Sequence, residues 1–341
     1  MNPVIESLRV LGALMVVVHH YTYQLSAQLA SQWTGLHFFH NGVDLFFVIT
    51  GYLFAPFLLG NKPISATGFI KRRFFRLYPL YLLSLITLAL ATQADLSLVL
   101  LIEHLFLVQN LPFHSLAETG AISLVYWTLA TEFQFYAFVL VVAIFYRDVQ
   151  ADWKLTLLLL ASMIGFLSSA YLNYSPKSDA WVLWQAQLPA LLLEFSFGVI
   201  VYQYASWWSK KVLSRLLLFA SLLLLWWLYS YYPLMLTESL TARPFGWFNV
   251  LSALGYAGLM AGLLGLQVRT KREFPTISKV AVFCGGLSYA VYLFHEAAIR
   301  WLNPLDIGNE IRVFLALLLT LTIAVVANHC LEIPLREYGR R

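Results

Sequence analysis

The chain has 341 residues, of which 60% are apolar, 16% are aromatic and only 11% are charged. Soluble globular domains carry about one quarter charged residues, so this composition excludes that class and indicates a membrane protein. Basic loops that face anionic lipid account for the net charge of +5, which therefore gives no argument for a nucleic-acid partner.

Apolar runs long enough to cross a bilayer as α-helices recur along the whole chain, without the alternating pattern of a membrane β-barrel. In chain order they predict ten spans, at residues 8–26, 41–60, 77–93, 123–146, 154–172, 185–205, 213–232, 246–268, 280–302 and 311–331. A further apolar segment, residues 96–111, contains Glu103 and His104 and is a candidate eleventh span. We therefore predict an all-α, polytopic helical membrane protein in which residues 1–341 form a single domain.

The distribution of basic residues predicts the orientation of these spans. With ten spans and a cytoplasmic N-terminus, all but four of the 22 Lys and Arg residues lie on the inner side. The four outer residues are Lys177, Arg243, Arg300 and Arg312. An eleventh span would place the later basic loops outside, so residues 96–111 are predicted to be a re-entrant or interfacial segment on the outer side. Both termini are then cytoplasmic.

Arg9 and His20 both lie in the first apolar stretch, although ionisable groups are costly in hydrocarbon. The separation of eleven positions corresponds to about three helical turns, so both side chains share one face of one helix. Each residue alone also fits a structural role, as a histidine bonded to a neighbouring helix or an arginine that reaches the headgroups. Together they indicate a substrate or ion path.

Three further ionisable residues, Asp44, Glu132 and His295, come from three other spans. A rise of 1.5 Å per residue places all three, with His20, in the outer half of the membrane. A single buried carboxylate also fits a helix-to-helix hydrogen bond. Two carboxylates and two imidazoles together predict one pocket with a general base and an orienting acid. Glu194, in the sixth span, either joins this group or packs beside it.

A basic cluster of Lys71, Arg72, Arg73 and Arg76 precedes the third span, and Arg9 lies at the same inner level. The cluster is either a plain topology signal or an anion clamp. Arg73 and Arg76 share one helix face if the helix includes them, and pairs of guanidinium groups suit phosphates through bidentate hydrogen bonds.

Six segments that contain these residues follow one another in a characteristic order. They are R-x10-H at Arg9 and His20, GVDLFFVITGYL at Gly42 to Leu53, Arg73 to Arg76 followed by LYPLY, WTLATEFQFY at Trp127 to Tyr136, LSYAVYLFH at Leu287 to His295, and EIPLR at Glu332 to Arg336. In this order and spacing they resemble the acyltransferase-3 family of bacterial membrane O-acyltransferases.

The resemblance implies transfer of an acyl group, usually acetyl from cytoplasmic acetyl-CoA, to a hydroxyl of a glycan or glycolipid. It implies that His20 is the catalytic base and that Asp44 and Glu132 are acidic residues of the same site. We hypothesise that one of these two carboxylates holds the tautomer of His20 and stabilises the imidazolium. The donor-binding residues would be Arg9, Arg73 and Arg76, with Arg72 beside them. The remaining site candidates are His295, Tyr136 and Glu194.

The expected partners are acyl-CoA, a glycan or lipid-linked glycan acceptor, and the lipids of a bacterial inner membrane; no metal and no nucleic acid are expected. Phe133 stands where the family is often acidic, and Glu296 and Ala297 replace an aromatic residue and proline after His295. These departures bear on the identity of the acceptor more than on the reaction that is catalysed. Some relatives carry a fused soluble domain, and this chain resembles the branch without one.

The main alternative is a proton-coupled transporter of a small molecule or glycolipid, because intramembrane His, Asp and Glu also relay protons. A transporter predicts internal repeats and broken helices at matching places in two halves, and the sequence shows neither. A lipid-binding or scaffold protein would not need the clustered ionisable groups.

Overall fold

The computed structural model describes residues 2–25, 34–91, 97–112, 120–172, 183–238, 246–270 and 275–340, and within these ranges every regular element is a helix. Within these described ranges, ten helices are long and apolar enough to cross a membrane. The predicted all-α membrane fold with ten spans is thereby confirmed. A few predicted positions lie outside the described residues. They are the segment ends at residues 26, 92–93 and 96, and the predicted outer residues Lys177 and Arg243.

The helices follow one another as α1 (Pro3–Leu25), η1 (Thr34–Asn41), α3 (Gly42–Leu58), α4 (Ala66–Ala91), α5 (Leu98–Leu105), α7 (Tyr126–Phe145), α8 (Ala151–Leu172), α10 (Leu188–Gln203), α11 (Ala205–Trp208), α12 (Lys211–Glu238), α13 (Trp247–Thr270), α14 (Pro275–Leu302), α15 (Asn309–Ala327), η2 (Asn328–Glu332) and α16 (Ile333–Tyr338). The short element η1 continues into α3. Likewise, α15, η2 and α16 form one continuous helical segment.

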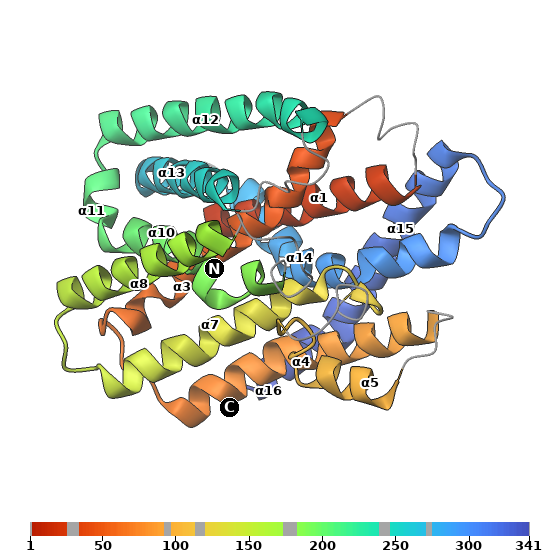
Figure 1. Ribbon diagram of the computed structural model, residues 1–341, viewed down its shortest axis with the longest axis horizontal. Helices are drawn as coiled ribbons and strands as arrows, with labels where there is room; N and C mark the ends of the chain where they lie inside the picture. Colours follow the sequence, from red (N-terminus) through yellow and green to blue (C-terminus); the bar gives the residue numbers. More distant parts are fainter. Residues whose placement is uncertain are drawn as a thin grey trace.

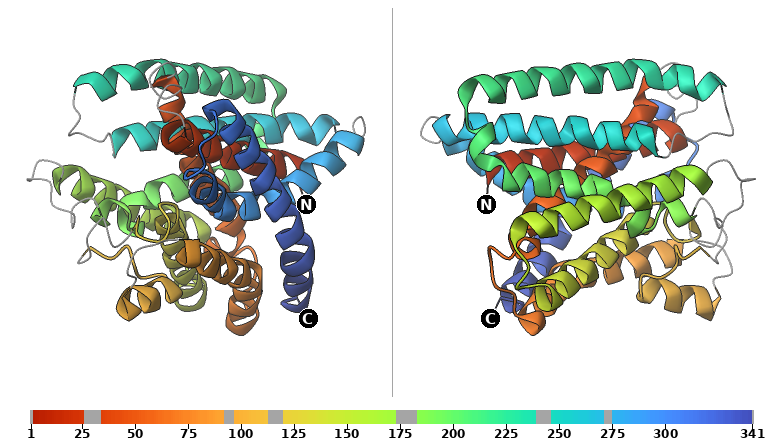
Figure 2. Two further views of the ribbon diagram at one scale, coloured as in Figure 1. Left: turned by 90° about the vertical axis from the view of Figure 1, so that its right-hand side faces the viewer. Right: turned by 60° about the vertical axis from the view of Figure 1, so that its left-hand side comes forward.

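The long helices pack against one another in a single bundle. Figure 1 shows α12 and α13 along one side and α4 and α5 along the opposite side, with α1, α3 and α14 between them. The most extensive packing joins α12 to α13, α3 to α10 and α1 to α14. Both termini lie at the same end of the bundle (Figure 2), as an even number of crossings requires.

Several helices begin earlier than their apolar runs, and two of them, α4 and α1, carry the arginines of interest. Helix α4 begins at Ala66 and not at residue 77, so Arg73 and Arg76 lie on the helix itself. Helix α1 begins at Pro3, which places Arg9 two turns inside it. The apolar run marks only the part of a helix that suits hydrocarbon, and Lys and Arg are good helix formers that extend it. The condition for Arg73 and Arg76 to share a face is therefore met.

The candidate eleventh span contains a single short helix. Helix α5 has eight residues, about 12 Å at 1.5 Å per residue, which is too short to cross a core of about 30 Å. Two tyrosine hydroxyls of α4 hold it, because Tyr78 donates to the carbonyl of Leu105 at 2.9 Å and Tyr81 to that of His104 at 2.7 Å. Its re-entrant or interfacial position in a membrane remains a prediction.

Helices α3 and α10 approach each other closely at two glycines. A Cβ atom on Gly51 would lie 1.9 Å from the carbonyl oxygen of Phe195, and one on Gly198 would lie 2.0 Å from that of Val48. Small residues at such crossings let two membrane helices pack backbone to backbone. This contact fixes α3, which contributes much of the cavity wall described below.

We expect Gly51→Ala to lower the thermal stability of the detergent-solubilised protein, because the added methyl group meets a backbone atom that has no room to shift. Overpacking of this kind typically costs about 1–3 kcal/mol. Gly286→Ala is the matched control, since a Cβ atom there meets nothing within 4 Å. Thermal unfolding followed by size-exclusion chromatography checks this, and equal melting of the two variants would contradict it.

Candidate active site

A cavity of about 250 Å³ lies among α1, α3, α4, α7 and α14. Three arginines enter it, Arg9 from α1 and Arg73 and Arg76 from α4, together with the carboxylate of Glu132 from α7. Most of the remaining wall is apolar, and its aromatic members on α3 are Phe46, Phe47, Phe54 and Phe57. Such a lining suits a ligand that combines anionic groups with an extended, weakly polar chain.

The arginines are held in defined positions. Arg9 Nη1 lies 3.2 Å from Glu6 Oε2 one turn earlier on α1. The guanidinium group of Arg73 lies over the rings of Phe54, at 4.9 Å, and Tyr136, at 5.8 Å. Such cation–π contacts hold the planar group in one orientation. Arg72, one residue earlier on α4, is exposed and does not line the cavity, so the structure separates it from the other three arginines.

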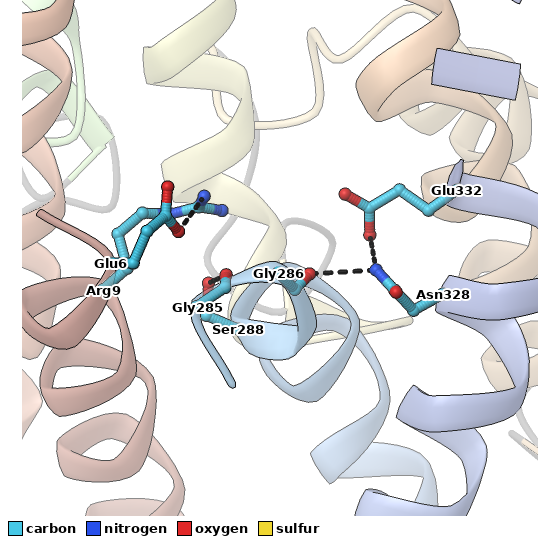
Figure 3. A network of polar contacts seen from close by, with 7 residues as sticks. All are labelled: Glu6, Arg9, Gly285, Gly286, Ser288, Asn328 and Glu332. Carbon is cyan, nitrogen blue, oxygen red and sulfur yellow. Dashed lines mark hydrogen bonds and ion pairs between the residues drawn. The ribbon is translucent and has the colours of Figure 1, made fainter. Parts of the chain in front are cut away.

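Figure 3 shows the surroundings of Arg9, with Glu6 and Arg9 on one side of α14 and Asn328 and Glu332 on the other. Asn328 Nδ2 donates to the carbonyl of Gly286 at 3.0 Å and to Glu332 Oε2 at 2.9 Å. Asn328 and Glu332 lie in η2, a π-helical turn, and such turns often occur at functional sites. The EIPLR motif thus begins with a carboxylate that holds Asn328, and the Asn328 amide in turn bonds to α14.

Glu132 faces the arginines and not the histidines. Its carboxylate accepts hydrogen bonds from the hydroxyl of Tyr136, one turn away, and from Thr50 Oγ1 at 3.4 Å. Sequence-based depth had grouped it with His20 and Asp44. Depth along one helix fixes only a level, however, and not which neighbours a side chain faces. Tyr136, another predicted site residue, lines the same cavity.

His20 and His295 form a close pair. The distance between His20 Nδ1 and His295 Nε2 is 2.7 Å, and the two rings are nearly parallel, with centroids 5.0 Å apart. His295 is fully buried, and its Nδ1 lies 2.8 Å from the carbonyl oxygen of Tyr292. Tyr292 also lines the cavity. The histidine pair is therefore one turn of α14 away from the arginine cavity.

Asp44 and Glu194 form a separate pair between α3 and α10. Both are 2% exposed, their carboxyl groups lie close enough to share a hydrogen bond, and neither lines the cavity. A hydrogen bond between two carboxyl groups requires a proton on one of them. The expectation that Asp44 or Glu132 holds His20 directly is thus not met in this geometry, because Asp44 is bonded to Glu194 and Glu132 to Tyr136.

The role of Glu296 was missed at the sequence level, where it counted only as a departure from the family pattern. Its carboxylate accepts from the Ser123 hydroxyl at 2.6 Å and from the Leu124 backbone N–H at 3.0 Å. These contacts anchor the segment that leads into α7, which carries Thr128 and Glu132. The available signal was a carboxylate within an otherwise apolar helix, which must find donors if it is buried.

His20, His295 and Glu296 each offer one ligand atom, and these atoms lie within 4.8 Å of one another. These three side chains already have hydrogen-bond partners. The two imidazoles bond to each other, and Glu296 bonds to the segment before α7. The hydrogen bonds thus account for this arrangement without an ion. That the protein uses no metal remains a prediction.

The sequence is similar to those of known proteins. The chain is 27% identical to the exopolysaccharide production protein ExoZ of Rhizobium meliloti, over 91% of this chain and 94% of that protein. It is 25% identical to the O-acetyltransferase OatA of Staphylococcus aureus, over 99% of this chain but only 57% of that longer protein.

No solved structure matches the chain. The acyltransferase domain family matches residues 2–329, which is nearly the whole chain. The ten-helix bundle, with an arginine cavity beside a histidine pair, is therefore that of a membrane protein of the acyltransferase-3 family, to which this chain belongs.

Proposed function

We propose that the protein is an O-acyltransferase that moves an acyl group, most simply acetyl, from cytoplasmic acyl-CoA to a hydroxyl group of a glycan or glycolipid. The observation that carries this proposal is the cavity, which joins three arginines to the immediate surroundings of the His20–His295 pair. The names of the relatives support it, since one is an O-acetyltransferase and the other acts in exopolysaccharide production.

The cavity provides for the donor. Arg9, Arg73 and Arg76 would bind the phosphate groups of coenzyme A, because guanidinium groups form bidentate, charge-assisted hydrogen bonds to phosphate. The apolar wall of α3 would accommodate the pantetheine arm. Glu132, bonded to Tyr136, would offset part of the positive charge of the arginines when the donor is absent.

His20 would act as the general base. It removes the proton of the acceptor hydroxyl while the hydroxyl oxygen attacks the carbonyl carbon of the thioester. The tetrahedral intermediate collapses with cleavage of the C–S bond, and the proton passes from His20 to the departing thiolate. The products are the acyl ester and free coenzyme A.

The donor would enter from the cytoplasm and the acceptor from the opposite side of a bacterial inner membrane. This orientation rests on the bias of basic residues toward one side. The position of both termini at one end of the bundle agrees with it (Figure 2). The acyl group would then cross part of the membrane during transfer.

The direct test is release of free coenzyme A by the purified protein when acetyl-CoA and a glycan acceptor are both supplied. Mass analysis of the host's surface glycan, with and without the gene, would identify the acceptor. Uptake of a small molecule into proteoliposomes, without coenzyme A release, would instead favour the transporter alternative.

Single cysteines should report the predicted orientation in a background that lacks Cys284 and Cys330. We expect Asp306→Cys, in the exposed connection between α14 and α15, to react with an impermeant thiol reagent in intact spheroplasts. Lys210→Cys, at an exposed position just before α12, should react only after the cells are broken. The opposite labelling pattern would invert the topology and move the acceptor side to the cytoplasm.

A further inference from the structure

The hydrogen bonds around His20 have a defined direction. The carbonyl oxygen of Tyr292 can only accept, so the 2.8 Å contact requires the proton of His295 to be on Nδ1. A neutral imidazole carries one N–H, so His295 Nε2 is then a bare acceptor. The 2.7 Å contact with His20 Nδ1 therefore requires His20 to donate from Nδ1.

The remaining ring nitrogen of His20 follows from this chain of contacts. With the proton on Nδ1, neutral His20 presents an unprotonated Nε2, which is the form that a base needs. We propose that His295 is the positioning residue that holds His20 in this tautomer, so that Nε2 receives the proton of the acceptor hydroxyl. This inference rests on the proposed function and assigns to His295 the part that the sequence assigned to Asp44 or Glu132.

The arrangement also serves the protonated state. When His20 Nε2 gains a proton, the ring becomes an imidazolium and its Nδ1–H still donates to His295. That hydrogen bond is then charge-assisted and stronger, which stabilises the cation without moving a second proton. His295 itself is fixed by complete burial and by its bond to α14.

No nearby carboxylate takes this place among the residues that the structure describes. Glu296 follows His295 directly, but its oxygens accept from Ser123 and Leu124. Asp44 is bonded to Glu194. The other imidazole against His20 is that of His19, whose ring centroid lies 5.2 Å away in an edge-on arrangement that makes no aligned hydrogen bond to it.

Two amide substitutions test the two ring nitrogens of His295 separately. In His295→Gln the side-chain oxygen reaches the position of Nε2 and still accepts from His20. In His295→Asn the shorter amide reproduces the donor to Tyr292 but leaves His20 without its acceptor. We expect kcat to fall by about 10²-fold or more in His295→Asn, the scale of general-base catalysis, and by less than about tenfold in His295→Gln. KM for acetyl-CoA should change little in either variant.

Nitrogen-15 NMR of the histidine-labelled full-length protein gives a readout that does not depend on activity. The His20 signal, assigned by its loss in His20→Ala, should show the proton on Nδ1 in the wild-type protein and in His295→Gln. A proton on Nε2, or stoichiometric zinc in the purified protein, would overturn the proposal. The wild-type spectrum decides the matter even if His295→Asn fails to fold.

The outcomes distinguish this inference from the proposed function. Full activity of His20→Ala would remove His20 as the base and, with it, the proposed mechanism. An inactive His20→Ala combined with equal activities of His295→Gln and His295→Asn would leave the enzyme assignment standing and reject only the positioning role of His295.

Discussion

His20→Ala is expected to abolish acyl transfer while the protein still reaches the membrane in normal amounts. The substitution removes the proposed base, and general-base catalysis alone is worth about 10²–10⁴-fold in rate. His20 is half-buried and contacts α14 through His295, and the packing of α1 against α14 extends well beyond this one contact, so truncation of His20 should leave the bundle intact. Coenzyme A release by the purified variant measures the loss.

His19→Ala is the matched control, because it removes an adjacent imidazole of the same size. Residue 19 lies about 100° around the helix from residue 20, and the His19 ring packs against His37, at 5.8 Å, and His40, at 5.7 Å. This variant should keep most of the activity. If His20→Ala and wild type released coenzyme A at similar rates, the base would have to be another group.

The sequence is sufficient to predict the helices and the arginine part of the candidate site. Long apolar runs predict the ten spans because a segment that crosses the hydrocarbon core must be mostly apolar and must bond its backbone groups within a helix. The eleven-residue spacing likewise puts Arg9 and His20 on one face of α1. Arg73 and Arg76 are also foreseeable, since residues three apart on a helix are neighbours.

Pairing between distant residues is what the sequence does not reveal. Nothing in the positions of His20 and His295, 275 residues apart, distinguishes their bond from one between His20 and Asp44. Depth along each helix groups all of them at one level, but the rotation of each helix decides its partners. That rotation depends on close crossings such as Gly51 against Phe195, which spacing along the chain does not report.

Arg73→Ala and Arg76→Ala are expected to weaken coenzyme A binding, whereas Arg72→Ala should bind the donor like the wild type. Arg73 and Arg76 line the cavity, and Arg72 is exposed outside it, so the three variants remove the same charge from adjacent positions. A hydrogen bond to a charged group contributes about 1.5–3 kcal/mol, which corresponds to about 10- to 10²-fold in Kd.

Titration calorimetry with coenzyme A at two ionic strengths separates this donor site from a mere topology signal. Contacts between guanidinium groups and phosphates weaken as salt screens them, so the wild-type Kd should rise with ionic strength and the Arg73 and Arg76 variants should respond less. Arg73→Lys adds a sharper criterion. It keeps the charge but loses both the planar fork and the aromatic contacts with Phe54 and Tyr136, so its affinity should fall between those of the wild type and Arg73→Ala. If all these variants, Arg72→Ala included, bound coenzyme A equally, the basic cluster would serve only to orient α4 in the membrane.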